Sequence, residues 1–224
     1  MIIGIQKHMT TTYPTNTQAS AMTWNSLVND IEQYLERSDS AVVNQIPEFI
    51  MLAEFEIAQQ IKTLGQIQVV ESTMSAGNPI IPKPVRWRKT VSFNVSSGGT
   101  ISPVFVRKYE YLRFYDSNAA QGLPLYYGDY NYDNWLVSPT PDQAYSFEVL
   151  YYERISPLSQ QNQTNWLTQN APNAMLYGTL LQAMPFLKND QRQIFQQKYT
   201  EAMTALKQED LLRTGDRQSV AQDS

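Results

Sequence analysis

The segment DYNYD, residues 129–133, places an oxygen-bearing side chain at every second residue, which is the spacing that begins an EF-hand calcium loop. The calcium motif also needs a glycine at its sixth position and a glutamate at its twelfth. This chain has Asn134 and Thr140 at those positions. We therefore predict a polar turn between two strands here, and no metal ion.

Carboxylates are the next candidates for chemistry, because a pair of them can act as general acid and base on a glycosidic bond. Glu54 and Glu56 are two residues apart on a predicted helix, so they point to different faces and cannot act together on one substrate. The carboxylates that could form such a pair in the middle of the chain are Glu110, Asp116, Asp129, Asp133 and Glu148. Solvated carboxylates on a sheet edge are the commoner explanation of such residues.

Other catalytic constellations are missing from the sequence. The single histidine, His8, lies near the N-terminus, far in sequence from any ordered nucleophile. The chain has no cysteine, and neither GxGxxG nor GxxxxGK[ST] occurs, so no thiolate site and no phosphate-binding loop is visible. We expect a protein without enzyme activity, cofactor or metal.

Aromatic residues are concentrated in the middle of the chain, where 10 of the 14 tyrosines lie between Tyr109 and Tyr152. Tyr126, Tyr127, Tyr130, Tyr132 and Trp135 could stack on sugars or bases. Tyrosine buries a ring while its hydroxyl stays in water, so a thin sheet domain or a contact surface explains the enrichment more simply.

The overall charge restricts the partners. A net charge of −4 argues against a surface that binds nucleic acid by neutralising phosphates, and no long run of Lys or Arg occurs. No apolar run of the length of a membrane span is present, and the N-terminus lacks the features of a signal peptide. We expect no membrane partner.

Helical periodicity marks both ends of the chain. Residues 46–64 carry an apolar stripe at three- and four-residue steps, and a second stripe follows Thr23, a plausible N-cap. Two more helical stripes lie between Met175 and Leu206, with Pro185 expected to end or kink the first of them at about Met184. None of these helices can bury its apolar stripe alone, so each needs a partner.

Between the helices the period changes to about two, as in strands. We predict strands at 66–72, 87–95, 101–106, 124–130, 134–137 and 145–154, and a short helix at 108–116. Residues 96–99, Ser-Ser-Gly-Gly, predict a hairpin turn. Residues 157–172 read as a polar loop.

These patterns predict an α+β protein. We expect an antiparallel helical bundle formed by the N- and C-terminal helix pairs, residues 22–65 and 158–212, with an inserted antiparallel β-rich domain, residues 66–157. Residues 1–21 would be a flexible arm or a short added strand, and residues 213–224 a flexible tail. The alternative is a helix pair, a sheet domain and a second helix pair in line.

Several stretches together resemble one family: IPEFIMLAEFEIAQQI (46–61), RKYEYLRFY (107–115), GLPLYYGDY (122–130), WLVSPTPDQAYSFEVLYYERISPLS (135–159) and NWLTQNAPNAMLYGTLLQAMPFLKND (165–190). They are similar to the adaptor, or head-to-tail connector, proteins of short-tailed bacteriophages, of the tail tubular protein A type. The resemblance covers roughly residues 22–212 and includes no catalytic motif. Residues 1–21 lie outside it.

The resemblance implies a structural protein of the virion tail or neck, assembled in the cytoplasm of the host bacterium. Its subunits would form a homomeric ring, commonly of twelve copies, beneath the portal protein. The ring would lengthen the DNA channel without sequence-specific binding of the DNA, and it would carry the tail nozzle and tail fibres. An acidic subunit suits such a conduit, because a wall that repels phosphates lets DNA slide.

The same resemblance suggests sites by position. The C-terminal helix and tail would dock on the portal through Leu206, Leu211, Leu212, Arg213 and Arg217. The exposed side of the 46–64 helix would face a neighbouring subunit through Glu48, Glu54 and Lys62. Nozzle or fibre contacts would use Tyr127, Tyr130, Tyr132 and Trp135.

Two alternatives remain open at this stage. In one, the tyrosine-rich insertion is a carbohydrate- or receptor-binding module of the virion. In the other, the carboxylates of the β-rich region make the chain a glycoside hydrolase.

Overall fold

The computed structural model describes residues 21–61, 64–115, 121–187 and 192–218, with only the backbone for Leu64 and for 213–218. The helices are α1 (Trp24–Leu35), α2 (Ser40–Val43), α3 (Ile46–Gln60), the 3-10 turn η1 (Leu64–Gln66), α4 (Tyr109–Tyr115), α5 (Trp166–Asn170), α6 (Pro172–Leu187) and α7 (Arg192–Gln218). The strands are β1 (Ile67–Met74), β2 (Ile80–Pro82), β3 (Trp87–Ser97), β4 (Thr100–Pro103), β5 (Phe105–Val106), β6 (Tyr126–Asp129), β7 (Asn134–Ser138) and β8 (Tyr145–Glu153). The predicted mixture of helix and sheet is confirmed.

Helix α1 begins where the sequence predicts, because Thr23 and Ser26 cap it reciprocally. The Ser26 backbone N–H donates to Thr23 Oγ1 at 3.1 Å, and the Thr23 N–H donates to Ser26 Oγ at 2.8 Å. This capping box satisfies two donors that a bare helix end leaves unpaired.

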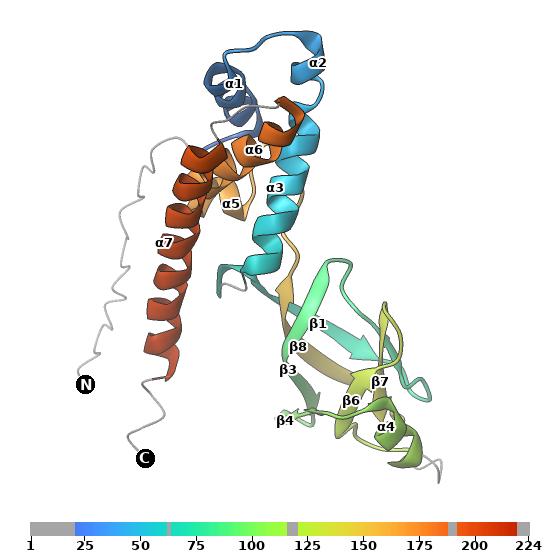
Figure 1. Ribbon diagram of the computed structural model, residues 1–224. Helices are drawn as coiled ribbons and strands as arrows, with labels where there is room; N and C mark the ends of the chain where they lie inside the picture. The colour runs from blue at the N-terminus through green and yellow to red at the C-terminus, as the bar shows by residue number, and fades with distance from the viewer. Residues whose placement is uncertain (1–20, 62–63, 116–120, 188–191, 219–224) are drawn as a thin grey trace, which may run out of the picture.

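Helices α1, α3, α6 and α7 share one apolar core, to which the N- and C-terminal parts of the chain both contribute. Gly178 marks the closest approach, since a Cβ at this position of α6 would lie 3.2 Å from the Tyr199 ring of α7 and 3.5 Å from Ala53 of α3. Each apolar stripe read from the sequence therefore has a partner. Figure 1 shows these helices together at one end of the molecule and the sheets with α4 at the other.

Helix boundaries differ from the predicted ones in several places. Helix α3 ends at Gln60. Helix α6 continues through Pro185 to Leu187, where Phe186 packs edge-on against Phe49 of α3 at 5.7 Å between ring centroids. Helix α7 runs to Gln218, beyond the predicted boundary at 212. The short helices α2 and α5 are not predicted from the sequence, because their few residues show no period.

Two four-stranded sheets form the other end, in the orders β1-β8-β3-β4 and β2-β7-β6-β5. Pairing is antiparallel except between β5 and β6. Their inner faces share a second apolar core around Phe93, Trp135 and Val149. The strand predicted at 101–106 is two strands in different sheets, since the chain crosses from one sheet to the other after Pro103.

The predicted hairpin turn at 96–99 is confirmed, and its two glycines have φ angles of 56° and 83°, a region that other residues rarely adopt.

One arginine joins the two ends of the molecule. Arg88 of β3 donates from Nη1 to the Ile61 carbonyl at 2.7 Å and from Nη2 to the Gln59 carbonyl at 3.3 Å. These carbonyls lie at the C-terminus of α3, where no helical N–H is available to them. Burial, together with the nearby Arg154, lowers the pKa of Arg88.

Candidate assembly surfaces

A row of apolar side chains on α3 faces away from the helical core. Met51 is 49% exposed, Leu52 40% and Phe55 62%. With Glu48, which is also exposed, they fall on one helical face. We call Met51, Leu52 and Phe55 the α3 outer face. The sequence pattern described above does not single out these residues, although a helix that is apolar beyond a single stripe is itself a signal of a second buried surface.

Glu54 does not lie on that exposed side, so this part of the expected subunit contact is wrong. Its side chain is 7% exposed, and its two carboxylate oxygens accept from the Leu158 N–H at 3.2 and 3.1 Å. Asn165 Nδ2 donates to the same carboxylate at 2.5 Å. Burial raises the pKa of Glu54, and these two donors oppose the rise. Glu54 thus holds the 158–165 loop on α3 inside the subunit.

Lys62, the third expected contact residue on this helix, lies outside the described residues.

The C-terminal part of α7 carries two leucines that the helical core does not cover. Leu211 is 71% exposed and Leu212 is 75% exposed. Leu206 differs from them, because it is only 7% exposed and belongs to the helical core. The expectation that Leu206 docks on a partner is therefore corrected. Arg213 and Arg217 lie on the helix, with side chains outside the described part of the chain.

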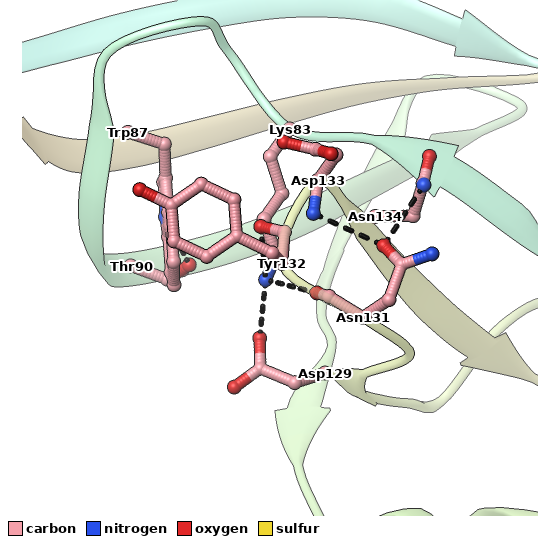
Figure 2. Close-up of polar contacts among 8 residues, drawn as sticks. All are labelled: Lys83, Trp87, Thr90, Asp129, Asn131, Tyr132, Asp133 and Asn134. Carbon is pink, nitrogen blue, oxygen red and sulfur yellow. Dashed lines mark hydrogen bonds and ion pairs between the residues drawn. The ribbon is translucent and has the colours of Figure 1, made fainter.

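The β6–β7 turn is the region that resembled a calcium loop, and a lysine serves as its cation (Figure 2). Lys83 Nζ donates to Asp129 Oδ1 at 2.6 Å, to the Asn131 carbonyl at 3.0 Å and to the Tyr132 carbonyl at 3.3 Å. The ammonium also lies 4.2 Å from the centroid of the Trp87 ring. The side chain of Lys83 is only 4% exposed. Of the three alternating side chains only Asp129 binds this ammonium, and the backbone carbonyls of Asn131 and Tyr132 supply the other oxygens.

Asn131 completes this turn by accepting bonds within it. Its Oδ1 accepts from the Asp133 N–H and from Asn134 Nδ2, both at 3.0 Å (Figure 2). An asparagine that bonds the backbone two residues ahead makes a local turn. The predicted polar turn between two strands is confirmed.

The four residues expected to contact a nozzle or fibres divide into exposed and buried ones. Tyr130 is 44% and Tyr132 is 74% exposed. Trp135 is 1% exposed in the core between the sheets, and Tyr127 packs partly buried against the same core. Strand β7 turns Trp135 inward, so Trp135 cannot contact a partner, and this expectation is corrected.

Helix α4 adds more exposed aromatic residues beside Tyr130 and Tyr132. Tyr109 of α4 lies 6.3 Å from Tyr130 between ring centroids, and Phe114 is 80% exposed. We call the following exposed rings the aromatic tip: Tyr109, Tyr111, Phe114, Tyr115, Tyr130 and Tyr132. The tip lies at the end of the molecule that is far from α1 (Figure 1).

The carboxylates considered for acid–base chemistry occupy ordinary surface positions where they are described. Asp129 pairs with Lys83, and Glu148 accepts from Asn94 Nδ2 at 3.4 Å. Asp116 lies outside the described residues. In the part of the chain that the structure covers, no group of three acidic, histidine or cysteine side chains could hold a metal ion.

No helix among the described residues combines the length and apolarity needed to cross a membrane.

Apolar and aromatic side chains are exposed on α3, on α7 and at the tip, around two separate cores, and such surfaces are typical of structural proteins that assemble with other chains. A family model described as SU10 adaptor protein matches residues 22–222. The chain belongs to this family of bacteriophage head-to-tail adaptors, and it is a structural component of a virion. No curated protein matches the chain.

Proposed function

We propose that this adaptor forms a homomeric ring of twelve copies that binds beneath the portal, lengthens the DNA channel and carries the tail nozzle and tail fibres. Assembly would take place in the host cytoplasm. The observation that carries the proposal is the family match over residues 22–222. It is supported by apolar side chains left exposed on three separate surfaces of one subunit.

The subunit contacts of the ring would use the α3 outer face together with Glu48. Exposed apolar side chains on one helical face gain free energy when a neighbour covers them. Lys62 stays a candidate for the same contact. Glu54 contributes indirectly, because it fixes the loop that packs beside α3.

The portal contact would use the end of α7, with Leu211 and Leu212 as its apolar anchors and Arg213 and Arg217 beside them. A helix that continues past the covered part of the core, with two exposed leucines, fits a groove on a second protein. Deletion of residues 213–224 should leave folding intact and weaken attachment to the portal.

The portal contact can be tested by mixing the purified chain with the portal protein of the same particle. We expect co-sedimentation and rings in electron micrographs. Replacing both Leu211 and Leu212 with Asp should abolish co-sedimentation. Ile194→Asp is the matched control, because Ile194 is 62% exposed near the other end of α7 and should not matter. Unchanged binding by the double variant would refute the docking role.

The aromatic tip would be the platform for the nozzle or the fibres. Aromatic rings are enriched at protein interfaces, because they bury a large area with little loss of side-chain entropy. Phe114→Asp and Tyr132→Asp should therefore keep rings and portal binding intact while nozzle or fibre attachment is lost.

We also propose the domain organisation expected from the sequence, with an antiparallel helical bundle from 22–65 and 158–212 and an insertion from 66–157. Two separate apolar cores support this division, one in each part. The net charge of −4 per subunit supports passage of DNA without specific binding.

The aromatic tip also supports a second candidate function, the binding of a carbohydrate or receptor. Exposed tyrosines such as Tyr132 can stack on sugar rings. A glycan array probed with assembled rings tests this function, and an array without signal at millimolar glycan would remove it.

A further inference from the structure

Strand β1 differs from the other edge strands of the two sheets, because it is both long and free of proline. The described edges are β1 and β4 in one sheet and β2 and β5 in the other. Strand β4 has 4 residues and ends at Pro103, β2 has 3 residues and ends at Pro82, and β5 has 2 residues. Short strands and prolines protect edges from pairing with other chains.

Strand β1 has none of these protections. It has 8 residues without a proline, and all of them pair in regular register with β8. Glu71 is its single charged residue. Its free side therefore offers a straight row of backbone donors and acceptors to another extended segment.

A groove of about 290 Å³ lies along this free edge. Val70, Ser72 and Met74 of β1 line one side, and Ile80 and Pro82 of β2 line the other. Alternate side chains of a strand point to opposite faces. A strand added to β1 would therefore place every second side chain in or over this groove.

Two carboxylates repel each other on the outer face of β1, and a cation on an added strand would reduce this repulsion. Glu71 lies directly opposite Glu148 of β8, and both are exposed. Like charges at directly opposite positions destabilise a sheet. A cation on a strand that pairs with β1 would lie next to this pair of carboxylates.

We propose that residues 1–20 of a neighbouring copy of this chain add a strand to the free edge of β1. This inference rests on the proposed ring, which places a second copy alongside. Residues 1–20 contain no acidic residue and carry Lys7, so their charge complements Glu71. They are rich in residues typical of strands, namely Ile2, Ile3, Ile5, Thr10, Thr11, Thr12 and Tyr13.

Length and position also favour a neighbouring copy. Twenty extended residues reach up to about 66 Å. The described chain begins just before α1, at the end of the helical part that lies far from the sheets (Figure 1). The segment thus starts away from its own β1, while a ring brings other subunits alongside. Main-chain hydrogen bonds between the added strand and β1 would then connect each subunit to the next.

The absence of cysteine allows a direct test by disulfide cross-linking. If Lys7 lies opposite Glu71, residue 73 lies opposite residue 5 in an antiparallel strand and opposite residue 9 in a parallel one. Chains with Thr73→Cys should be mixed with differently tagged chains that carry Ile5→Cys or Met9→Cys, assembled into rings and oxidised. We expect a disulfide between the two tagged chains for one of these pairs.

The matched control is Thr100→Cys, an exposed residue on the opposite edge strand of the same sheet. It should give no cross-link with either arm cysteine. The proposal is overturned by the absence of a disulfide at Thr73 or by equal cross-linking at Thr100. Rings without the cross-link would overturn this inference alone, whereas the absence of rings would count against the proposed function.

A charge exchange tests the pairing without oxidation. Lys7→Glu and Glu71→Lys should each weaken ring assembly about two- to fivefold, as expected for an exposed ion pair. The double variant should restore it, which a merely structural role of either residue would not predict. Failure of the double variant to recover, while circular dichroism shows a folded chain, would overturn the pairing of these residues.

Discussion

Replacing Lys83 with Met isolates the contribution of the buried ammonium, because Met keeps the length and apolar contacts of the side chain. The variant leaves the carbonyls of Asn131 and Tyr132 without their charged donor (Figure 2). Hydrogen bonds to charged groups contribute about 1.5–3 kcal/mol each. The contact with the Trp87 ring adds about 0.5–2 kcal/mol.

One further loss adds little to this sum, and a second effect reduces it. The side chain of Asp129 is 70% exposed, so loss of its ion pair matters little, about 0–1 kcal/mol. Removing the ammonium also removes the free energy of burying it, which is several kcal/mol. We therefore expect Lys83→Met to lower the free energy of unfolding of the sheet end by about 2–4 kcal/mol.

Hydrogen exchange combined with urea unfolding is the suitable assay, because the two apolar cores need not unfold together. Protection should be lost in the β6–β7 turn and stay unchanged in α3 and α6. Asp129→Asn is the control, and its effect should stay below about 1 kcal/mol. If Lys83→Met is no more destabilising than Asp129→Asn, the ammonium does not hold this turn.

Three further predictions concern single contacts. Because burial raises the pKa of Glu54, the folded chain binds its proton more tightly than the unfolded chain, so the free energy of unfolding should fall as pH rises above the ordinary value of 4.5. Glu54→Gln should remove this part of the slope in urea titrations at a series of pH values, and an unchanged slope would contradict the burial argument. Arg88→Met should lower the free energy of unfolding by about 1–3 kcal/mol and increase hydrogen exchange in the last turn of α3. Normal protection there would show that the Arg88 hydrogen bonds to α3 are dispensable. Gly128→Ala should cost about 1–3 kcal/mol in thermal unfolding, since its Cβ would clash with the Arg107 carbonyl and Leu112. Gly122→Ala is the control and should be nearly neutral, because only Pro139 lies near, at 3.9 Å.

The sequence alone determined the features that depend on neighbours along the chain. The cap at Thr23, the α3 stripe and the hairpin at 96–99 all follow from local preferences of the backbone and from the period of apolar residues. The mixed class of the fold follows from the change of period after α3. The incomplete calcium motif also predicts the turn correctly, because the missing glycine and glutamate are visible in the sequence.

Only the tertiary structure decided which polar residues are buried and which apolar ones stay exposed. Glu54 meets Asn165 across 111 residues, and Lys83 meets Asp129 across 46, so neither pair leaves a local pattern. Leu206 and Leu211 differ from these pairs, because they are five residues apart on α7 and face different sides of the helix, so the period itself separates the leucine that the core covers from the one that it leaves exposed. Periodicity says which face of an element is apolar. How far along that face the core extends depends on packing between elements that are distant in sequence.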